Sequence, residues 1–156
     1  MGAPATGGVA QDAMLELISF EIAGQTFCFD IRAVREIRGW TPATPVPQAP
    51  GYVIGLINLR GAIMPVVDLR ARLGLGKTSP SSRHVIVVID DGSRVAGLLV
   101  DGVEETFRVE PTSAQAPPDL GIADIDQFVD GVIPSQDRLI SRLVVGRLLP
   151  DLAQAA

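Results

Sequence analysis

Short runs of β-branched residues, each followed by a turn signal, constrain the fold of this chain most. Val and Ile together number 30 against 15 Leu, and β-branched side chains suit a pleated strand better than a helix. Runs at 53–57, 63–67, 85–89 and 95–103 recur at hairpin spacing. We count nine or ten such strands without long helical units between them, which predicts a mainly β fold of one or two small barrels rather than a nucleotide-binding parallel sheet.

The N-terminal part of this pattern predicts a hairpin and then a helix. Leu15–Ile22 alternates, 23–26 is a turn, and the partner strand places Cys28 on the face opposite its two phenylalanine neighbours. Asp30 is then a helix cap, since Ile31, Val34 and Ile37 follow at a spacing of three and Gly39 ends the segment.

The central part contains a stiff connector and a second hairpin. The connector is the proline-rich segment 41–50. Gly55 predicts a bulge or a close approach of two backbones, and Pro65 predicts an edge or bulged strand. Asp68 is expected to cap one helical turn over 69–73. The segment 74–78 superficially resembles a phosphate loop but lacks the required four-residue gap.

Scarcity of catalytic residue types narrows the function. One histidine, His84, and one cysteine, Cys28, exclude a Cys/His zinc site and a disulfide within the chain. The net charge is −5 and the 12 arginines are dispersed among acids, which argues against nucleic acid as a partner. We therefore predict no catalytic residue, no metal and no cofactor.

An enzyme or ligand-binding barrel remains the alternative from another class. Its candidate residues are carboxylates, namely Asp68, Asp90, Asp91 and Asp101. Asp68 has a capping role and Asp90 and Asp91 have turn roles, which leaves Asp101 as the least explained of the four.

Several blocks, in order along the chain, resemble CheW-like chemotaxis coupling proteins. The most specific is Asn58-Leu59-Arg60-Gly61 followed by Pro65-Val66-Val67-Asp68-Leu69-Arg70. Softer matches are Asp30-Ile31 with Val34–Arg38, Pro45–Pro47, Gly55–Ile57, Arg94–Val103 and Asp137–Ile140. Thr106 and the segment 142–145 depart from the family pattern, and 115–130 matches weakly.

The resemblance implies two SH3-like five-stranded barrels sharing a core, with short helices. Residues 15–152 would form a single domain of two barrel halves, with tails at 1–14 and 153–156. The implied function is a non-enzymatic adaptor between chemoreceptor tips and the regulatory domain of a CheA-type histidine kinase. A cytoplasmic protein reaching membrane arrays through its partners is expected, and a non-motility pathway would be served by the same adaptor role.

The same resemblance suggests which residues bind partners. Glu36, on the expected helix, and Arg60 would lie close together on an exposed binding face, and an ordinary surface ion pair is the alternative reading. Strand 95–100 and its neighbours would supply the surface facing the kinase. The remaining candidates are Gly55, Asn58 and Gly61 near the second hairpin, and Val34, Val85 and Val103, which match positions lining the receptor groove and are equally compatible with a core role.

Overall fold

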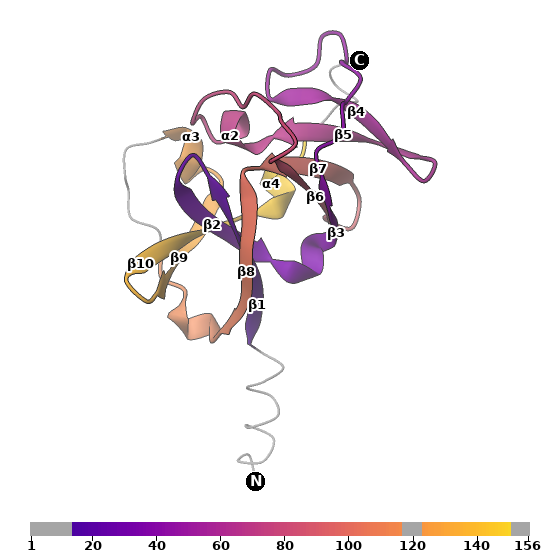
Figure 1. The fold of residues 1–156 in the computed structure, drawn as a ribbon. Helices are drawn as coiled ribbons and strands as arrows, with labels where there is room; N and C mark the ends of the chain where they lie inside the picture. The colour runs from indigo at the N-terminus through magenta and orange to yellow at the C-terminus, as the bar shows by residue number, and fades with distance from the viewer. Residues whose placement is uncertain (1–13, 117–122, 151–156) are drawn as a thin grey trace.

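Ten strands form two five-stranded sheets in the computed structural model, which describes residues 14–116 and 123–150 (Figure 1). The first sheet has the order β8-β1-β2-β10-β9 and consists of β1 (Leu15–Ile22), β2 (Gln25–Asp30), β8 (Gly102–Val109), β9 (Val129–Ser135) and β10 (Arg138–Leu143). The second has the order β3-β6-β7-β5-β4 and consists of β3 (Val34–Gly39), β4 (Val53–Leu59), β5 (Ala62–Asp68), β6 (Val85–Asp90) and β7 (Val95–Val100).

The two sheets share one arrangement of strands. Each has a central antiparallel hairpin, β1–β2 or β6–β7, whose second strand pairs in parallel with a strand of another hairpin, β10–β9 or β5–β4. The first strand of each central hairpin takes an antiparallel neighbour on its other side, β8 or β3. The predicted pair of five-stranded SH3-like barrels is confirmed.

Helical segments are short. They are the 3-10 turns Ile31–Ala33 and Pro111–Ser113 and the single-turn helices α2 (Leu69–Arg72), α3 (Ala123–Asp126) and α4 (Val145–Leu148). Within the described ranges no helix has the length and apolar character needed to cross a lipid bilayer.

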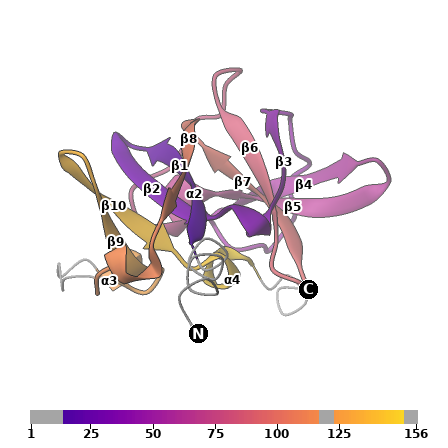
Figure 2. The ribbon, with the colours of Figure 1, turned by 90° about the horizontal axis from the view of Figure 1, so that it is seen from below.

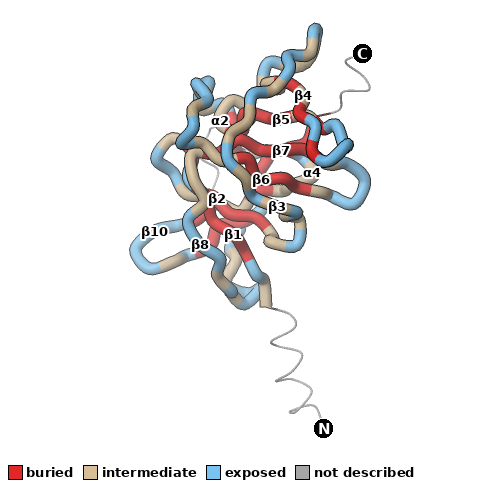
Figure 3. The backbone as a smooth tube through the Cα atoms, turned by 45° about the vertical axis from the view of Figure 1, so that its right-hand side comes forward, coloured by how far each residue is buried: buried red, intermediate tan, exposed pale blue. Residues whose placement is uncertain are grey.

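A large apolar cluster lies between the barrels and belongs to both. Phe20 and Phe27 of the first sheet share it with Val67, Val87 and Leu98 of the second. Opposite faces of the same strands enter a smaller core inside each barrel: Ile86 and Val88 in one, and Leu17 and Cys28 in the other. Figure 3 shows the buried residues concentrated in these central strands, and Figure 2 shows the two sheets side by side.

The helix expected over 30–39 is wrong. Asp30 does cap a turn, since its carboxylate accepts a hydrogen bond from the Arg32 amide, but the turn ends at Ala33. From Val34 the backbone is extended as β3 and pairs with β6 from Ile89 to Val85. A short isolated helix is marginal in water, whereas the ladder to β6 joins this segment to a strand of the core sheet.

The sequence predicts an edge or bulged strand at Pro65. The strand is interior, so the edge position is wrong, while the pairing of β5 with β4 does contain a register shift between Val53 and Gly55. β5 has β4 on one side and β7 on the other. The strand tolerates the proline because its parallel ladder to β7 begins only at Val66.

Gly55 marks both a register shift and a close backbone approach, as expected. The connector crosses β4 there, with Thr44 and Leu56 exchanging backbone hydrogen bonds of 2.9 and 2.8 Å. A Cβ atom on Gly55 would lie 2.4 Å from the carbonyl oxygen of Thr44.

We therefore predict that Gly55→Ala lowers the free energy of unfolding by about 1–3 kcal/mol, because two backbones must separate. Urea denaturation measures the change. Gly39→Ala is the matched control in β3, where a Cβ would meet nothing within 4 Å, and its effect should stay within about 0.5 kcal/mol. Equal effects of the two substitutions would contradict the steric account.

Cys28 generates a second prediction. Burial raises the pKa of its thiol to about 12 from the usual 9.0, and the nearby Arg142 guanidinium only partly opposes this. Because the folded-state pKa is the higher one, the thiol's contribution to stability is complete below about pH 9 and is lost as the pH rises toward about 12.

Comparing the intact chain with Cys28→Ala isolates this effect. The difference between their free energies of unfolding should be constant up to about pH 8 and move in favour of the variant by about pH 11. Two curves that stay parallel over that range would show that the thiol ionises as easily in the folded protein as in the unfolded one.

Candidate functional site

The tip of the β4–β5 hairpin presents Arg60. Arg60 and Gly61 both have positive φ, 53° and 88°, as a tight two-residue hairpin turn requires. The Asn58 side-chain oxygen accepts a hydrogen bond of 2.9 Å from the Gly61 amide. Asn58 and Gly61 thus shape the turn that holds Arg60 outward, with three-quarters of its side chain exposed.

Arg60 forms an ion pair with Glu36, which lies in β3 rather than on a helix. β3 and β4 are the two edges of the sheet, so the pair joins one edge to the hairpin tip at the other and closes the barrel. Arg38 also approaches Glu36, at 4.0 Å. The prediction that Glu36 and Arg60 lie close together is confirmed. An exposed ion pair of this kind contributes only ~0–1 kcal/mol to the stability of the fold.

Beside this ion pair is a hollow of about 420 Å³. Its lining combines the charged pair with apolar side chains of the hairpin and of β6: Arg35, Glu36, Leu59, Arg60, Ala62, Met64 and Val88. Two large apolar side chains on the same strands are exposed, Ile37 at 46 % and Ile63 at 68 %. The expected helix placed Ile37 on one face with Ile31 and Val34, and the strand alternation of β3 turns it outward.

The three candidate valines are half-buried and pack against the shared core. They do not meet at one point. Val34 pairs with Ile89 of β6, and Ile89 lies four residues, or ~13 Å along the strand, from Val85. Val103 is the second residue of β8 and lies opposite Phe20. Strand β7 itself offers no kinase-facing surface, because it lies between β6 and β5 and its residues 96–100 are buried; that expectation is wrong for the strand itself.

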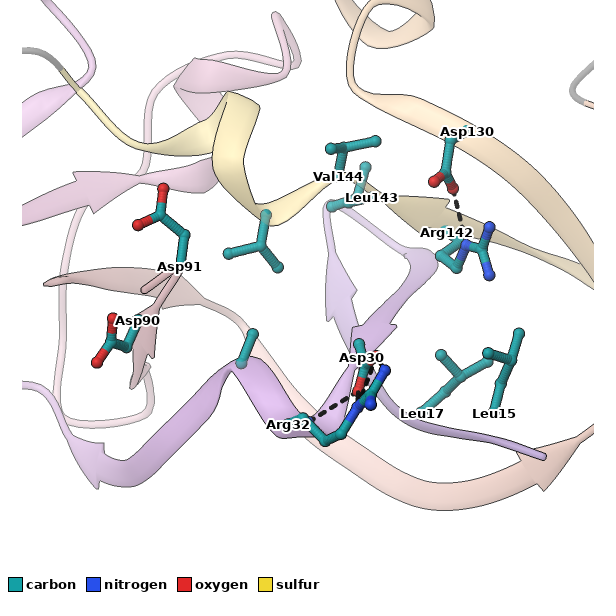
Figure 4. Close-up of a pocket in the computed structure, with 12 residues that line it drawn as sticks. Leu15, Leu17, Asp30, Arg32, Asp90, Asp91, Asp130, Arg142, Leu143 and Val144 are labelled. Atoms are coloured by element: carbon teal, nitrogen blue, oxygen red, sulfur yellow. Dashed lines mark hydrogen bonds and ion pairs between the residues drawn. The ribbon is translucent and has the colours of Figure 1, made fainter. Parts of the chain in front are cut away.

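A second hollow, of about 490 Å³, opens between the barrels (Figure 4). Leu15 and Leu17 from β1 and Leu143, Val144 and Val145 near the end of β10 form its apolar side. The whole segment that departs from the family pattern, 142–145, therefore lines an accessible hollow.

Charged residues frame this hollow in pairs. Arg142 donates a hydrogen bond of 2.7 Å to Asp130, and Arg32 binds Asp30. The Arg32 side-chain hydrogen bond lowers the pKa of the Asp30 carboxyl below its usual value. Each of these two carboxylates therefore has its charge balanced by a neighbouring guanidinium, that of Arg32 for Asp30 and that of Arg142 for Asp130.

The four carboxylates considered as catalytic candidates all accept hydrogen bonds that hold caps, turns or strands in place. Asp68 caps α2 and binds Thr78, while Asp90 accepts from the Gly92 amide and Asp101 from the Ala23 amide. Backbone amides of Ser93 and Arg94 lower the pKa of Asp91 to about 2. No group of three or more potential metal ligands occurs among the residues that the structure describes.

The fold is that of two fused β barrels, and the four candidate acids have capping, turn and ion-pair roles within it. Residues 16–153 match the CheW-like domain. The chain therefore belongs to the CheW family, and its function is that of a non-enzymatic scaffold which couples chemoreceptors to CheA in chemotaxis.

Individual relatives agree with this assignment. The chain is 48 % identical to chemotaxis protein CheW of Rhizobium meliloti, covering 87 % of this chain and 88 % of that protein. It is 43 % identical to a probable chemotaxis protein CheW of Rhizobium etli, covering 90 % and 91 %. The crystal structure of the scaffolding protein TtCheW from Thermoanaerobacter tengcongensis superposes with a TM-score of 0.78 at 32 % identity, covering 86 % of this chain and 87 % of that one.

Proposed function

We propose that the face carrying the Glu36–Arg60 pair binds the regulatory domain of a CheA-type histidine kinase and helps to join it to the cytoplasmic tips of chemoreceptors. The observation that carries the proposal is the ion pair itself: it closes the barrel edges, yet leaves the Arg60 guanidinium mostly exposed beside an apolar-lined hollow. An exposed, fixed charge next to apolar surface is a usual composition for a protein interface.

The valines support a separate receptor contact. Val85 and Val103 flank the corner between β7 and β8, and Val34 begins β3. We propose that they contact a helical receptor tip, which can dock an apolar face on such side chains. We also propose that 15–152 act as a single domain, located in the cytoplasm and held at membrane arrays through its partners; residues 1–13 and 151–156 of the expected tails and C-terminus lie outside the described residues.

Arg60→Glu should abolish co-sedimentation of the kinase with receptor-containing membranes, while the free energy of unfolding changes by no more than about 1 kcal/mol. The substitution replaces the exposed cation by an anion and places like charges beside Glu36. Arg108→Glu is the matched control, because Arg108 is also an exposed arginine in an ion pair. Its partner is Glu16, at 4.0 Å, and the pair lies in the first sheet, away from this face. Undiminished co-sedimentation in Arg60→Glu would sink the proposal.

The double variant Glu36→Arg with Arg60→Glu restores an ion pair of reversed polarity. Because we assign Arg60 a direct contact, the double variant should fold normally and still fail to co-sediment. Full recovery would mean that the pair serves only to close the barrel.

For the receptor contact, Val85→Thr should weaken binding of a receptor-tip fragment severalfold, since a buried hydroxyl without a partner costs ~1–3 kcal/mol. Val95→Thr is the control, as Val95 is also half-buried at a strand start but packs on the core of the second barrel. Both variants should lose a similar free energy of unfolding, and denaturation curves will check that any difference in receptor binding is not caused by a difference in stability. Equal loss of receptor binding in both would assign Val85 to the core alone.

A further inference from the structure

The cations of this chain are almost all paired. Eight of the twelve arginines form ion pairs with carboxylates among the described residues. Two more, Arg72 and Arg147, donate to backbone carbonyls near α4 and α3. Arg70, Arg83 and the single lysine, Lys77, form no ion pair within the described part of the chain, and all three line the same hollow of about 650 Å³.

This hollow, the cationic hollow, lies where the two sheets meet. Arg70 comes from α2, Lys77 and Arg83 from the segment between α2 and β6, and Glu21 and Asp101 from the ends of β1 and β7. The Asp101 amide donates a hydrogen bond of 3.0 Å to the Glu21 carbonyl, which fastens the two sheets together at this point.

The segment carrying the cations is held in place from several sides. Asp68, which is 4 % exposed, accepts hydrogen bonds of 2.7 Å from both the amide and the hydroxyl of Thr78. The Arg70 Nε donates to the Leu75 carbonyl at 3.0 Å, and His84 Nδ1 accepts from the Ser81 amide at 3.0 Å. The walls are thus positioned before any ligand arrives, which reduces the entropy lost on binding.

Gly76 allows this arrangement. Its φ is +108°, and a Cβ atom would lie 3.4 Å from the Arg70 Nε. The positive φ would strain any side chain at this position, and its Cβ would already contact the guanidinium, so the glycine suits the close turn of this segment over Arg70.

We propose that the cationic hollow binds a small phosphate-bearing anion, with Arg70, Lys77 and Arg83 as its contacts. Guanidinium and ammonium groups are the side chains that recognise phosphate most strongly. Glu21 and Asp101 leave the hollow with a net charge of only about +1, which disfavours an extended polyanion such as nucleic acid. A volume of about 650 Å³ lies within the usual range for small-molecule sites.

Titration of the full chain with inorganic pyrophosphate, followed by amide NMR shifts, tests the proposal. Saturable shifts are expected for the amides between 75 and 84 and for Glu21 and Asp101. Lys77→Gln and Arg83→Gln each remove one exposed cation and leave the core unchanged. Each should raise the dissociation constant for pyrophosphate about tenfold. Arg83→Lys should retain most of the affinity.

Arg108→Gln is the control, since it removes the same charge on a distant strand of the first sheet. It should leave pyrophosphate affinity unchanged. The proposal is overturned if the shifts do not saturate, if they lie elsewhere, or if Arg108→Gln weakens binding as much as Arg83→Gln, which would show attraction by overall charge alone. The result is independent of kinase and receptor binding, so it stands or falls separately from the scaffold assignment.

Discussion

The shared core between the two barrels is the constraint on which the rest of this structure depends. Phe20 packs at a tilt against Phe29, with ring centroids 4.8 Å apart, and stacks against Phe27 at 6.3 Å. These rings belong to the same cluster as residues of β5, β6 and β7. Each barrel encloses only a few buried side chains of its own. Separating the barrels would expose the apolar side chains of the shared cluster to water, so we infer that the two halves fold as one.

The shared core also decides where function can reside. Because the central strands are buried on both faces, the side chains of β7 from Ala96 onward cannot meet a partner. Edges, hairpin tips and the junction of the sheets remain. Glu36 on one edge and Arg60 at a hairpin tip occupy such positions, and the cationic hollow occupies the junction.

Much of the fold followed from local pattern. Strands were predicted because continuous β-branched runs such as 85–89 have few alternatives, and the helical turn capped by Asp68 was predicted because its signals are local. The helix over 30–39 failed because the apolar residues are three apart, which fits a helix, whereas the strand alternation puts Val34 and Ile37 on opposite faces and turns Glu36 and Arg38 to the same side as Val34. Only the ladder to β6, some fifty residues away in the chain, decides between the two.

The site was predicted less completely for the same reason. Resemblance placed Glu36 near Arg60, but nothing local indicates that residues 24 apart close a barrel. The exposure of Ile63 depends on the course of its hairpin, and the cationic hollow joins residues from α2, the following segment and the ends of β1 and β7. Contacts between distant elements are invisible to periodicity.

The arginine excess acquires a structural meaning from these contacts. Arg138 of β10 reaches Thr26 on the neighbouring strand β2 and also Glu104 on β8, which is not a neighbour of β10 in the first sheet. Arg60 does the equivalent in the second sheet, and Arg94 ties the β6–β7 turn to the Gly146 carbonyl in α4. A planar guanidinium with several donors suits such links better than an ammonium. Most of the positive charge is thus used to close barrels and join elements. In the cationic hollow Arg70 keeps a backbone partner, the Leu75 carbonyl, whereas folding supplies no carboxylate for Lys77 or Arg83 among the described residues, and a bound anion would account for their convergence on Arg70.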